Sequence, residues 1–301
     1  MQIAGICPIA PAVYNAAGEV DLADYERCCA TMIRLGADAL TLFGIAGEYY
    51  KMDYDEELAL IDSTVRVCHD QQRPVIISNT RHATEVAVKW ARRIEASGAD
   101  CMMVLPPFFL KPGGAALFAH LDALCGSVSL PVMLQYAPEQ TGVAIAPEVL
   151  AQLAKKHGNL LYFKIECKPP GAYISKLSGL LPPGRTIFVG NAGFQMIEGF
   201  MRGAAGVMPG PSMVDVYRRI WDALKADRVA DAEAIHEKLN AILNHIRQDV
   251  EMIIYYEKEI LRRRGMIKTA YCRHPGHVSD PVNNALFERL YPMIAKEFLP
   301  L

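Results

Sequence analysis

The stretch NLLYFKIECKPPG, residues 159–171, predicts a short buried strand that ends in a turn and carries a lysine in its middle. Side chains alternate along a strand, so Tyr162, Lys164 and Glu166 share one face while the opposite face is wholly apolar. The apolar face suits packing against helices. The lysine needs a partner or a chemical use, because burying its charge in an apolar environment is costly.

Similar apolar runs recur along the whole chain. Together with the run at Asn159, they begin at Ile3, Ala37, Pro74, Ala99, Pro131, Thr186 and Gly203. Amphipathic, helix-like segments separate them, and near-continuous apolar strands are what a parallel sheet covered by helices needs. Eight such units predict an α/β protein, a closed (β/α)8 TIM barrel. A doubly wound open sheet is the competing architecture, but no GxGxxG loop follows any of the predicted strands.

The C-terminal quarter of the chain has a different pattern. From about Arg228 to Leu301 the sequence looks wholly helical, with apolar residues at helical spacing over several turns. We therefore predict a barrel over residues 1–226. Residues 227–301 are expected to form a C-terminal helical extension, a bundle packed on the barrel.

Composition excludes several classes of function. The 301 residues carry a net charge of −2 without a basic stripe or acidic tail, which argues against nucleic acid and anionic membrane as partners. We see no signal peptide and no apolar run long enough to span a bilayer, so a cytoplasmic location is expected. The eight cysteines are scattered without a CxxC pair and are expected to be buried free thiols rather than disulfides or zinc ligands.

Lys164 falls near the C-terminal end of its strand, where barrel active sites are built. Three interpretations of this lysine compete. It is a structural lysine paired with Glu166 or another acid, a lysine that snorkels at the barrel rim, or a nucleophile that forms a Schiff base with a carbonyl. Position alone leaves all three open.

Five segments, in this order, give the chain its resemblance to a known family. They are FGIAGEYYKMDYDEE (43–57), VLPPFFLKP (104–112), PVMLQYAPEQTG (131–142), YFKIE (162–166) and VGNAGFQMIEGFMRGAAGVMPG (189–210). The chain resembles the dihydrodipicolinate synthase/N-acetylneuraminate lyase family of class I aldolases. The resemblance implies that Lys164 is the Schiff-base lysine. It also implies a small 2-oxo acid substrate, no cofactor or metal beyond the covalent lysine imine, and a homotetramer built as a dimer of dimers.

The resemblance also implies how the substrate carboxylate is held. The turn formed by Gly44, Ile45, Ala46 and Gly47 would present backbone N–H groups to it, as tight glycine-flanked turns can. Without the resemblance, a plain tight turn with no ligand is the simpler interpretation. Glu48 follows, matches the family's Gly-Glu pair, and is expected to fix the loop.

The departures from the synthase pattern are as informative as the matches. Hydroxyl, amide and arginine side chains of that pattern are replaced here by Ile45 and Ala46 after strand two, Phe108 and Phe109 after strand four, and Gln135, Tyr136 and Gln140 around strand five. The resemblance therefore argues against the lysine-biosynthesis synthase and against a typical sialic acid lyase, and it leaves the general acid/base unassigned. The segments PVMLQYAP, YFKIE and LRRRGMIKTAYCRHP look most like 2-keto-3-deoxy-pentonate dehydratases, especially L-2-keto-3-deoxyarabonate dehydratase.

The expected chemistry is attack of Lys164 on C2 of a 2-oxo acid, which gives an imine that acidifies C3. Loss of the C4 hydroxyl then dehydrates a 2-keto-3-deoxy sugar acid. Cleavage of the C3–C4 bond, giving pyruvate and an aldehyde, is the alternative lyase reaction. A catalytically silent barrel that binds a 2-oxo acid is the alternative of a different class, and a metal-dependent barrel lyase is disfavoured because strand ends lack clustered His, Asp and Glu.

Several polar residues at strand ends are candidates for handling protons and substrate. We expect Gln135 to face inward and Tyr136, on the opposite face, to serve mainly in packing, while Glu166 either handles protons or holds Lys164 protonated. Asn191 is expected to bind substrate hydroxyls. Further candidates for the proton-transfer set are Ser78, Asn79, Thr80 and His82, and the predicted substrate contacts also include Asn79, Phe109 and Tyr136. His274 and His277 have metal-like proximity but are expected on a surface loop.

Overall fold

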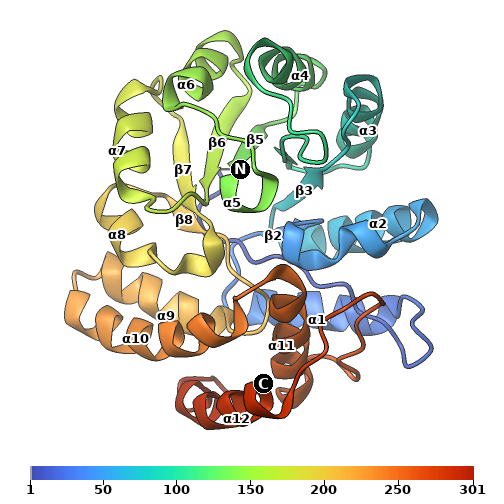
Figure 1. Cartoon of the computed structure of the whole chain (residues 1–301), viewed down its shortest axis with the longest axis vertical. Helices are drawn as coiled ribbons and strands as arrows, with labels where there is room; N and C mark the ends of the chain where they lie inside the picture. Colours follow the sequence, from blue (N-terminus) through green and yellow to red (C-terminus); the bar gives the residue numbers. More distant parts are fainter. Residues whose placement is uncertain (1) are drawn as a thin grey trace. The chain divides into compact units, whose positions relative to one another are not determined.

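The computed structural model describes residues 2–301, which form two compact units. The first unit contains residues 2–4 and 74–208, and the second contains residues 5–73 and 209–301. Across the described chain, eight strands alternate with helices, as the sequence pattern predicts (Figure 1).

Parallel strands that pair in chain order are the framework of the first unit. Among its described residues these are β3 (Val75–Asn79), β4 (Cys101–Val104), β5 (Val132–Tyr136), β6 (Leu160–Ile165), β7 (Thr186–Val189) and β8 (Gly206–Val207). Nearly every strand residue is buried, as expected for parallel strands covered by helices. The register places Gln135 beside Lys164 and Lys164 beside Phe188.

The helices of the first unit follow its strands, and the longer ones lie around them in Figure 1. They are α3 (Thr84–Ala96), α4 (Gly114–Gly126), α5 (Pro138–Thr141), α6 (Pro147–Lys156), α7 (Gly171–Leu180), the one-turn 3-10 helix η3 (Asn191–Gly193) and α8 (Met196–Met201). The Asn159 side chain fixes the start of β6, because its amide nitrogen donates to the carbonyl of Cys125 in the last turn of α4 and to those of Val128 and Leu130 in the loop before β5.

The second unit begins with the remaining two strands. They are β1 (Gly5–Ile6) and β2 (Leu40–Leu42), and Ile9 bridges to Thr41 in parallel. Its N-terminal helices are α1 (Leu22–Arg34), the one-turn helices η1 (Ile45–Gly47) and η2 (Tyr49–Lys51), and α2 (Tyr54–Asp70). A capping box starts α2, since the Asp53 carboxylate accepts from the Glu56 N–H and the Glu56 carboxylate accepts from the Asp53 N–H.

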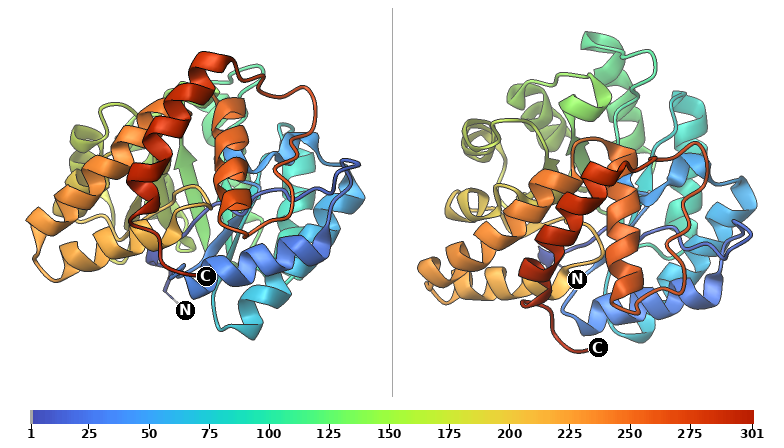
Figure 2. Two further views of the ribbon diagram at one scale, coloured as in Figure 1. Left: turned by 90° about the horizontal axis from the view of Figure 1, so that it is seen from below. Right: turned by 60° about the horizontal axis from the view of Figure 1, so that its bottom comes forward.

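The C-terminal helices of the second unit are α9 (Val214–Lys225), α10 (Val229–Ile246), α11 (Val250–Arg263) and α12 (Pro281–Ala295). Helix α10 packs between α9 and α12, as both views in Figure 2 show. The expectation of helix throughout the C-terminal quarter is wrong for residues 264–280, which connect α11 to α12 without regular secondary structure. Pro275 and Pro281 fall at this connection and at the start of α12, where proline ends or begins helices rather than continuing them.

Two smaller sequence predictions concern thiols and membranes. All eight cysteines are free; seven are buried, as predicted, whereas Cys272 is half-buried. Burial raises the pKa of Cys29 and Cys125 to about 12, so both thiols keep their protons at neutral pH. Over residues 2–301, the longest helices lack the apolar length needed to cross a bilayer.

Candidate active site

Lys164 lies on β6 and is almost completely buried, with 3% of its surface exposed. Its Nζ atom is 3.3 Å from Oε1 of Glu166, which is also buried. Strand alternation predicts this shared face, and the contact confirms it. The neighbouring side chains Phe163 and Ile165 are buried among apolar residues, so the lysine is the polar exception on a hydrophobic strand.

The Glu166 carboxylate is the centre of a hydrogen-bonded group. Oε1 accepts from the backbone N–H of Asn191 at 2.9 Å, and Oε2 accepts from the Gln135 side-chain amide at 2.5 Å. Burial alone would raise the pKa of Glu166, but the Lys164 charge, the Asn191 N–H and the Gln135 amide together hold it below its ordinary value. Glu166 is therefore a carboxylate at neutral pH.

Gly190 permits the close approach of this turn to the carboxylate. A Cβ atom at Gly190 would stand 2.2 Å from Cγ of Glu166 and 2.6 Å from its Oε1, distances that real carbon atoms do not tolerate. Glycine after β7 thus allows the Asn191 N–H to reach Glu166. The requirement lies in the space around position 190, since its own φ of −95° is open to other residues.

The turn that follows β7 is held in an unusual backbone conformation. Asn191 and Ala192 have φ values of 52° and 49°, in the left-handed region that non-glycine residues avoid. Each such residue costs about 1–3 kcal/mol and persists where surrounding structure over-determines it. Here the strained turn directs its first N–H at Glu166. Asn191 is buried beside Glu166, the partner of Lys164. Its contact with substrate hydroxyls stays a prediction.

Gln135 and Tyr136 face opposite ways on β5, as predicted. Gln135 is buried and donates to Glu166, whereas the Tyr136 ring stacks on Tyr173 of α7 with 4.5 Å between centroids. The Tyr173 hydroxyl in turn donates to the Ile145 carbonyl at 2.9 Å. Burial raises the pKa of Tyr136, so its hydroxyl keeps its proton. A substrate contact by Tyr136 stays a prediction, and packing is its observed role.

The remaining candidates of the first unit differ in how they are engaged. The Asn79 amide donates to the Ala87 carbonyl of α3 at 2.8 Å, which fixes the start of that helix. Ser78 is buried, and its hydroxyl has no hydrogen-bond partner within residues 2–301. Phe109 is 80% exposed, whereas the neighbouring Phe108 packs on the His82 ring with 4.6 Å between centroids. A substrate contact by Phe109 stays a prediction.

The predicted carboxylate-binding turn belongs to the second unit. The Gly47 N–H donates to the Gly44 carbonyl at 2.8 Å and closes the one-turn helix η1 over Ile45 and Ala46. A Cβ at Gly44 would come within 2.7 Å of the Ile9 side chain, so glycine is required there by packing. Lys164 lies in the first unit, and a shared role of turn and lysine stays a prediction.

Glu48 ends this turn with a φ of 56° and is completely buried. Its Oε2 accepts from Lys258 of α11, and its Oε1 lies 3.4 Å from Nζ of Lys51. The sequence analysis missed Lys258. The available signal was a lysine on the apolar face of α11, four residues after Ile254 and three before Leu261, both of which are buried.

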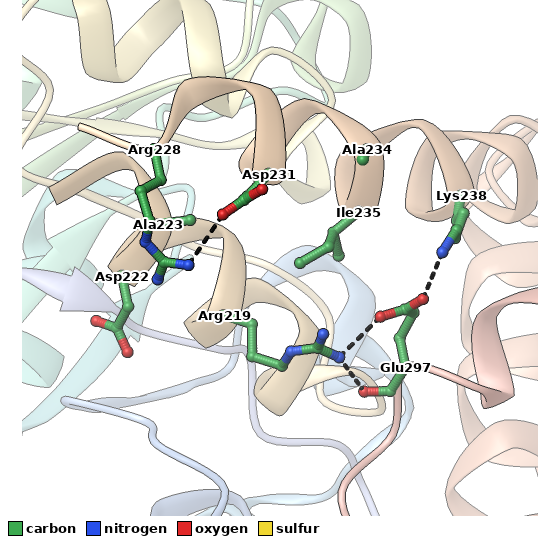
Figure 3. Close-up of a pocket in the computed structure, with 9 residues that line it drawn as sticks. All are labelled: Arg219, Asp222, Ala223, Arg228, Asp231, Ala234, Ile235, Lys238 and Glu297. Atoms are coloured by element: carbon green, nitrogen blue, oxygen red, sulfur yellow. Dashed lines mark hydrogen bonds and ion pairs between the residues drawn. The ribbon is translucent and has the colours of Figure 1, made fainter. Parts of the chain in front are cut away.

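A surface cleft of about 580 Å³ lies elsewhere in the second unit, along α9, α10 and the segment after α12 (Figure 3). Its charged side chains pair with one another, except that Asp222 pairs with Arg218 outside the lining. Arg219 and Lys238 both bind Glu297, and Arg228 binds Asp231. The predicted site residues are absent from its lining, and its cations are already paired, so this cleft does not favour a 2-oxo acid.

Metal ligands were not predicted, and the histidines near the C-terminus have other contacts. His274 is exposed, and the His277 ring packs against Tyr255 and Tyr256 with centroids 5.4 and 6.0 Å apart. Within residues 2–301, His, Cys, Asp and Glu side chains nowhere gather in threes with a geometry that would hold a metal ion.

Comparison with known proteins identifies the family. The model of the dihydrodipicolinate synthetase family matches residues 2–288. The chain belongs to this family. Among curated relatives, it is 27% identical to L-2-keto-3-deoxyarabonate dehydratase from Azospirillum brasilense over 97% of this chain and 96% of that protein. It is 30% identical to 4-hydroxy-tetrahydrodipicolinate synthase from Exiguobacterium sibiricum over 80% of this chain and 81% of that one.

A solved structure of the dihydrodipicolinate synthetase family shows the same fold. It is a prophage protein from E. coli K12, determined in complex with pyruvate, and it superposes with a TM-score of 0.87. The two sequences are 22% identical, and the match covers 97% of this chain and 99% of that one. The predicted (β/α)8 TIM barrel with a C-terminal helical extension is thereby confirmed. Members of the family are lyases or aldolases.

Proposed function

We propose that this protein is a Schiff-base lyase that dehydrates a 2-keto-3-deoxy sugar acid. The observation that carries the proposal is the buried contact of Lys164 with the Glu166 carboxylate, which Gln135 and the Asn191 N–H also bind. A lysine in this position needs a base to release its proton before attack. A carboxylate 3.3 Å away, ionised at neutral pH, is suited to that task.

In the proposed reaction, Glu166 takes a proton from the Lys164 ammonium, and the neutral amine attacks the C2 carbonyl of the substrate to give a carbinolamine. Glu166 then gives this proton to the carbinolamine hydroxyl, which leaves as water, so that an iminium ion forms and Glu166 is again a carboxylate. The positive nitrogen acidifies the C3 hydrogens, and Glu166 removes one of them. The electron pair of that C–H bond forms the C3–C4 double bond, and the C4 hydroxyl leaves as water with the proton from Glu166. Hydrolysis of the imine then restores the lysine and releases the dehydrated 2-oxo acid.

Substrate binding in this proposal follows the family resemblance. The turn from Gly44 to Gly47 holds the substrate carboxylate through backbone N–H groups, and Asn191 contacts substrate hydroxyls. The 27% identity to a 2-keto-3-deoxy-pentonate dehydratase over nearly the whole of both chains supports the substrate class. The replacement of the family's relay of hydroxyl groups by Ile45, Phe109 and Gln135 supports dehydration over the synthase reaction.

The test uses two assays in sequence. First, pyruvate and borohydride are added, and peptide mass spectrometry should find a reduced adduct on Lys164 that is absent from Lys164→Met. If the wild-type protein binds pyruvate without forming an adduct, the lyase proposal fails and the silent binding barrel replaces it. Second, incubation with 2-keto-3-deoxy pentonates should consume substrate without releasing pyruvate. Release of pyruvate with an aldehyde would instead establish the retro-aldol alternative.

Assembly and domain boundary are part of the same proposal. The family resemblance supports a homotetramer arranged as a dimer of dimers, and light scattering of the purified protein measures its mass directly. The sequence pattern supports a barrel over residues 1–226 followed by a helical bundle over residues 227–301. Limited proteolysis tests that boundary, because cleavage concentrates at exposed connections between compact parts.

A further inference from the structure

We propose that Lys258 of α11 is a positioning residue that holds the carboxylate-binding turn in shape by binding Glu48. The inference rests on the proposed function, because it takes residues 44–47 as the place where the 2-oxo acid carboxylate binds. It adds a residue from the C-terminal helices, far away in the sequence, whose contribution is to substrate affinity rather than to the chemical step.

The contact between Lys258 and Glu48 is a fully buried ion pair. The two side chains are 2% and 0% exposed, and Nζ of Lys258 donates to Oε2 of Glu48. The same ammonium donates to the Tyr271 carbonyl at 2.9 Å and lies 4.5 Å from the centre of the Tyr14 ring. Removing Lys258 would leave the buried Glu48 carboxylate with Lys51, 3.4 Å away, as its remaining cation, and the loss of the closer partner has to be relieved by movement of the local structure.

Glu48 is the residue that the turn depends on for its shape. Its left-handed φ of 56° joins η1 to η2, so the backbone changes direction at this residue. Helix α11 packs directly against η1. Because a non-glycine residue in this region of φ is strained, its side-chain bonds must hold it there. The bond to Lys258 supplies that restraint.

The turn formed by residues 44–47 depends on this restraint because of its own side chains. Ile45 and Ala46 carry no hydroxyl, so any anion held by the turn is bound through backbone N–H groups alone. The direction of those groups is fixed by backbone dihedral angles, and Gly47 already donates to Gly44. A shift of Glu48 therefore changes the very groups that are proposed to bind the carboxylate.

A second set of contacts joins Lys51, at the end of η2, to Glu251 of α11 and to Arg273 of the connection between α11 and α12. Lys51 donates to the Arg273 carbonyl at 2.9 Å and to Glu251 at 2.6 Å, and Arg273 donates to the Lys51 carbonyl at 2.7 Å. Lys268 of the same connection binds Asp21 at 3.1 Å. This connection is visible in Figure 2 as the orange-red segment that leaves α11. Lys258 is the member of this network that contacts Glu48 most directly.

The decisive variant is Lys258→Met, and Arg264→Met is its matched control. Arg264 also lies at α11 and forms a buried ion pair, with Asp215 of α9 at 2.7 Å, but it has no contact with residues 44–48 among its hydrogen bonds and ion pairs. Both variants lose a buried cation in the second unit. Loss of stability is expected in both, so thermal midpoints and circular dichroism first establish that both are folded at the assay temperature.

The readout is borohydride trapping of the lysine imine over a series of pyruvate concentrations. Lys258→Met should raise the half-saturating pyruvate concentration about tenfold, while the amount of adduct at saturation stays equal to that of wild type. Arg264→Met should leave the half-saturating concentration within about twofold. Amide hydrogen exchange of residues 44–51 should accelerate only in Lys258→Met. Lys258→Gln, which keeps a donor without a charge, should fall between wild type and Lys258→Met and serves if the methionine variant does not fold.

The outcomes separate the two proposals. If wild type forms no adduct at any pyruvate concentration, the proposed function fails, and the positioning role fails with it. If wild type is trapped but Lys258→Met saturates at the same pyruvate concentration, only the positioning role is overturned. An equal rise in both variants also overturns it, because the effect then comes from lost stability and not from the turn.

Discussion

The substitution Gly190→Ala tests whether the geometry around Glu166 carries the chemistry. An added Cβ would stand 2.2 Å from Cγ of Glu166 and 2.6 Å from its Cδ and Oε1. Carbon atoms in favourable contact lie about 3.5–4.0 Å apart, so the carboxylate has to move by roughly 1.5 Å. It is already held 3.3 Å from Lys164 Nζ and 2.9 Å from the Asn191 N–H, and such a movement breaks at least one of these contacts.

Two magnitudes follow for Gly190→Ala. Inserting a methyl group into a closely packed site costs about 1–3 kcal/mol of unfolding free energy. Misplacing a catalytic group by about 1 Å lowers turnover by about 100-fold. The rate of adduct formation with pyruvate and borohydride should fall in parallel, because Glu166 no longer takes the lysine proton.

The control for this prediction is Gly179→Ala in α7. A Cβ at Gly179 meets no atom within 4 Å, and alanine in a helix stabilises by about 0.5–1 kcal/mol relative to glycine. Turnover and trapping rates are measured for both variants beside their urea unfolding curves. If Gly190→Ala is trapped at the wild-type rate and is as stable as wild type, the reasoning is refuted, since the carboxylate would then be free to move without consequence.

Three further predictions use single isosteric changes. Glu166→Gln should slow imine formation about 100-fold, which trapping rates measure. It should also remove a contribution to the free energy of unfolding that wild type has above pH 4.5, the ordinary pKa of glutamate, and loses as pH falls through the lowered pKa of the folded state. Unfolding curves between pH 3 and 7 measure this second effect. Glu257 is buried against the Ser212 N–H and its pKa is raised, so its contribution to stability is present below pH 4.5 and is lost as pH rises through the folded pKa. Glu257→Gln should therefore be more stable than wild type near pH 7 and lose this pH dependence, and a thermal midpoint that falls instead at pH 7 would contradict the assignment. Tyr136→Phe should change trapping by less than about twofold, because its ring packs on Tyr173 while Gln135 faces the lysine; a larger loss would give the hydroxyl a role in the reaction.

The sequence was sufficient for those parts of the fold and site that follow from local periodicity. Alternation along residues 160–166 places Lys164 and Glu166 on one face, and the same rule separates Gln135 from Tyr136. These inferences held because strand geometry admits little variation once a segment is buried on both sides. The count of strand and helix units likewise predicted the barrel, since each unit has its own apolar run and punctuation.

The features that the sequence did not predict are contacts between distant residues and details of loops and turns. Lys258 and Glu48 are 210 residues apart, and composition or spacing does not pair them. The difference in burial between Phe108 and Phe109 arises in the loop after β4, where no periodicity predicts which side chain is covered. The close contact of Gly190 with Glu166 lies between the ends of β7 and β6 and is followed by a strained turn. Backbone strain depends on how the folded chain packs, so a local sequence pattern does not predict it.

The identity of the residues around Glu166 bears on the course of the proposed reaction. Gln135 donates to the carboxylate through an amide, which stabilises the negative charge but has no proton to transfer at neutral pH. The Asn191 contact is a backbone N–H, which is equally unable to act as an acid. Within this hydrogen-bonded group only Glu166 can carry a proton from one atom to another once Lys164 is held as the imine. The same carboxylate then has to take the C3 proton and deliver it to the departing C4 hydroxyl. Because a single group reaches both atoms from one side of the substrate, elimination by this site should be syn.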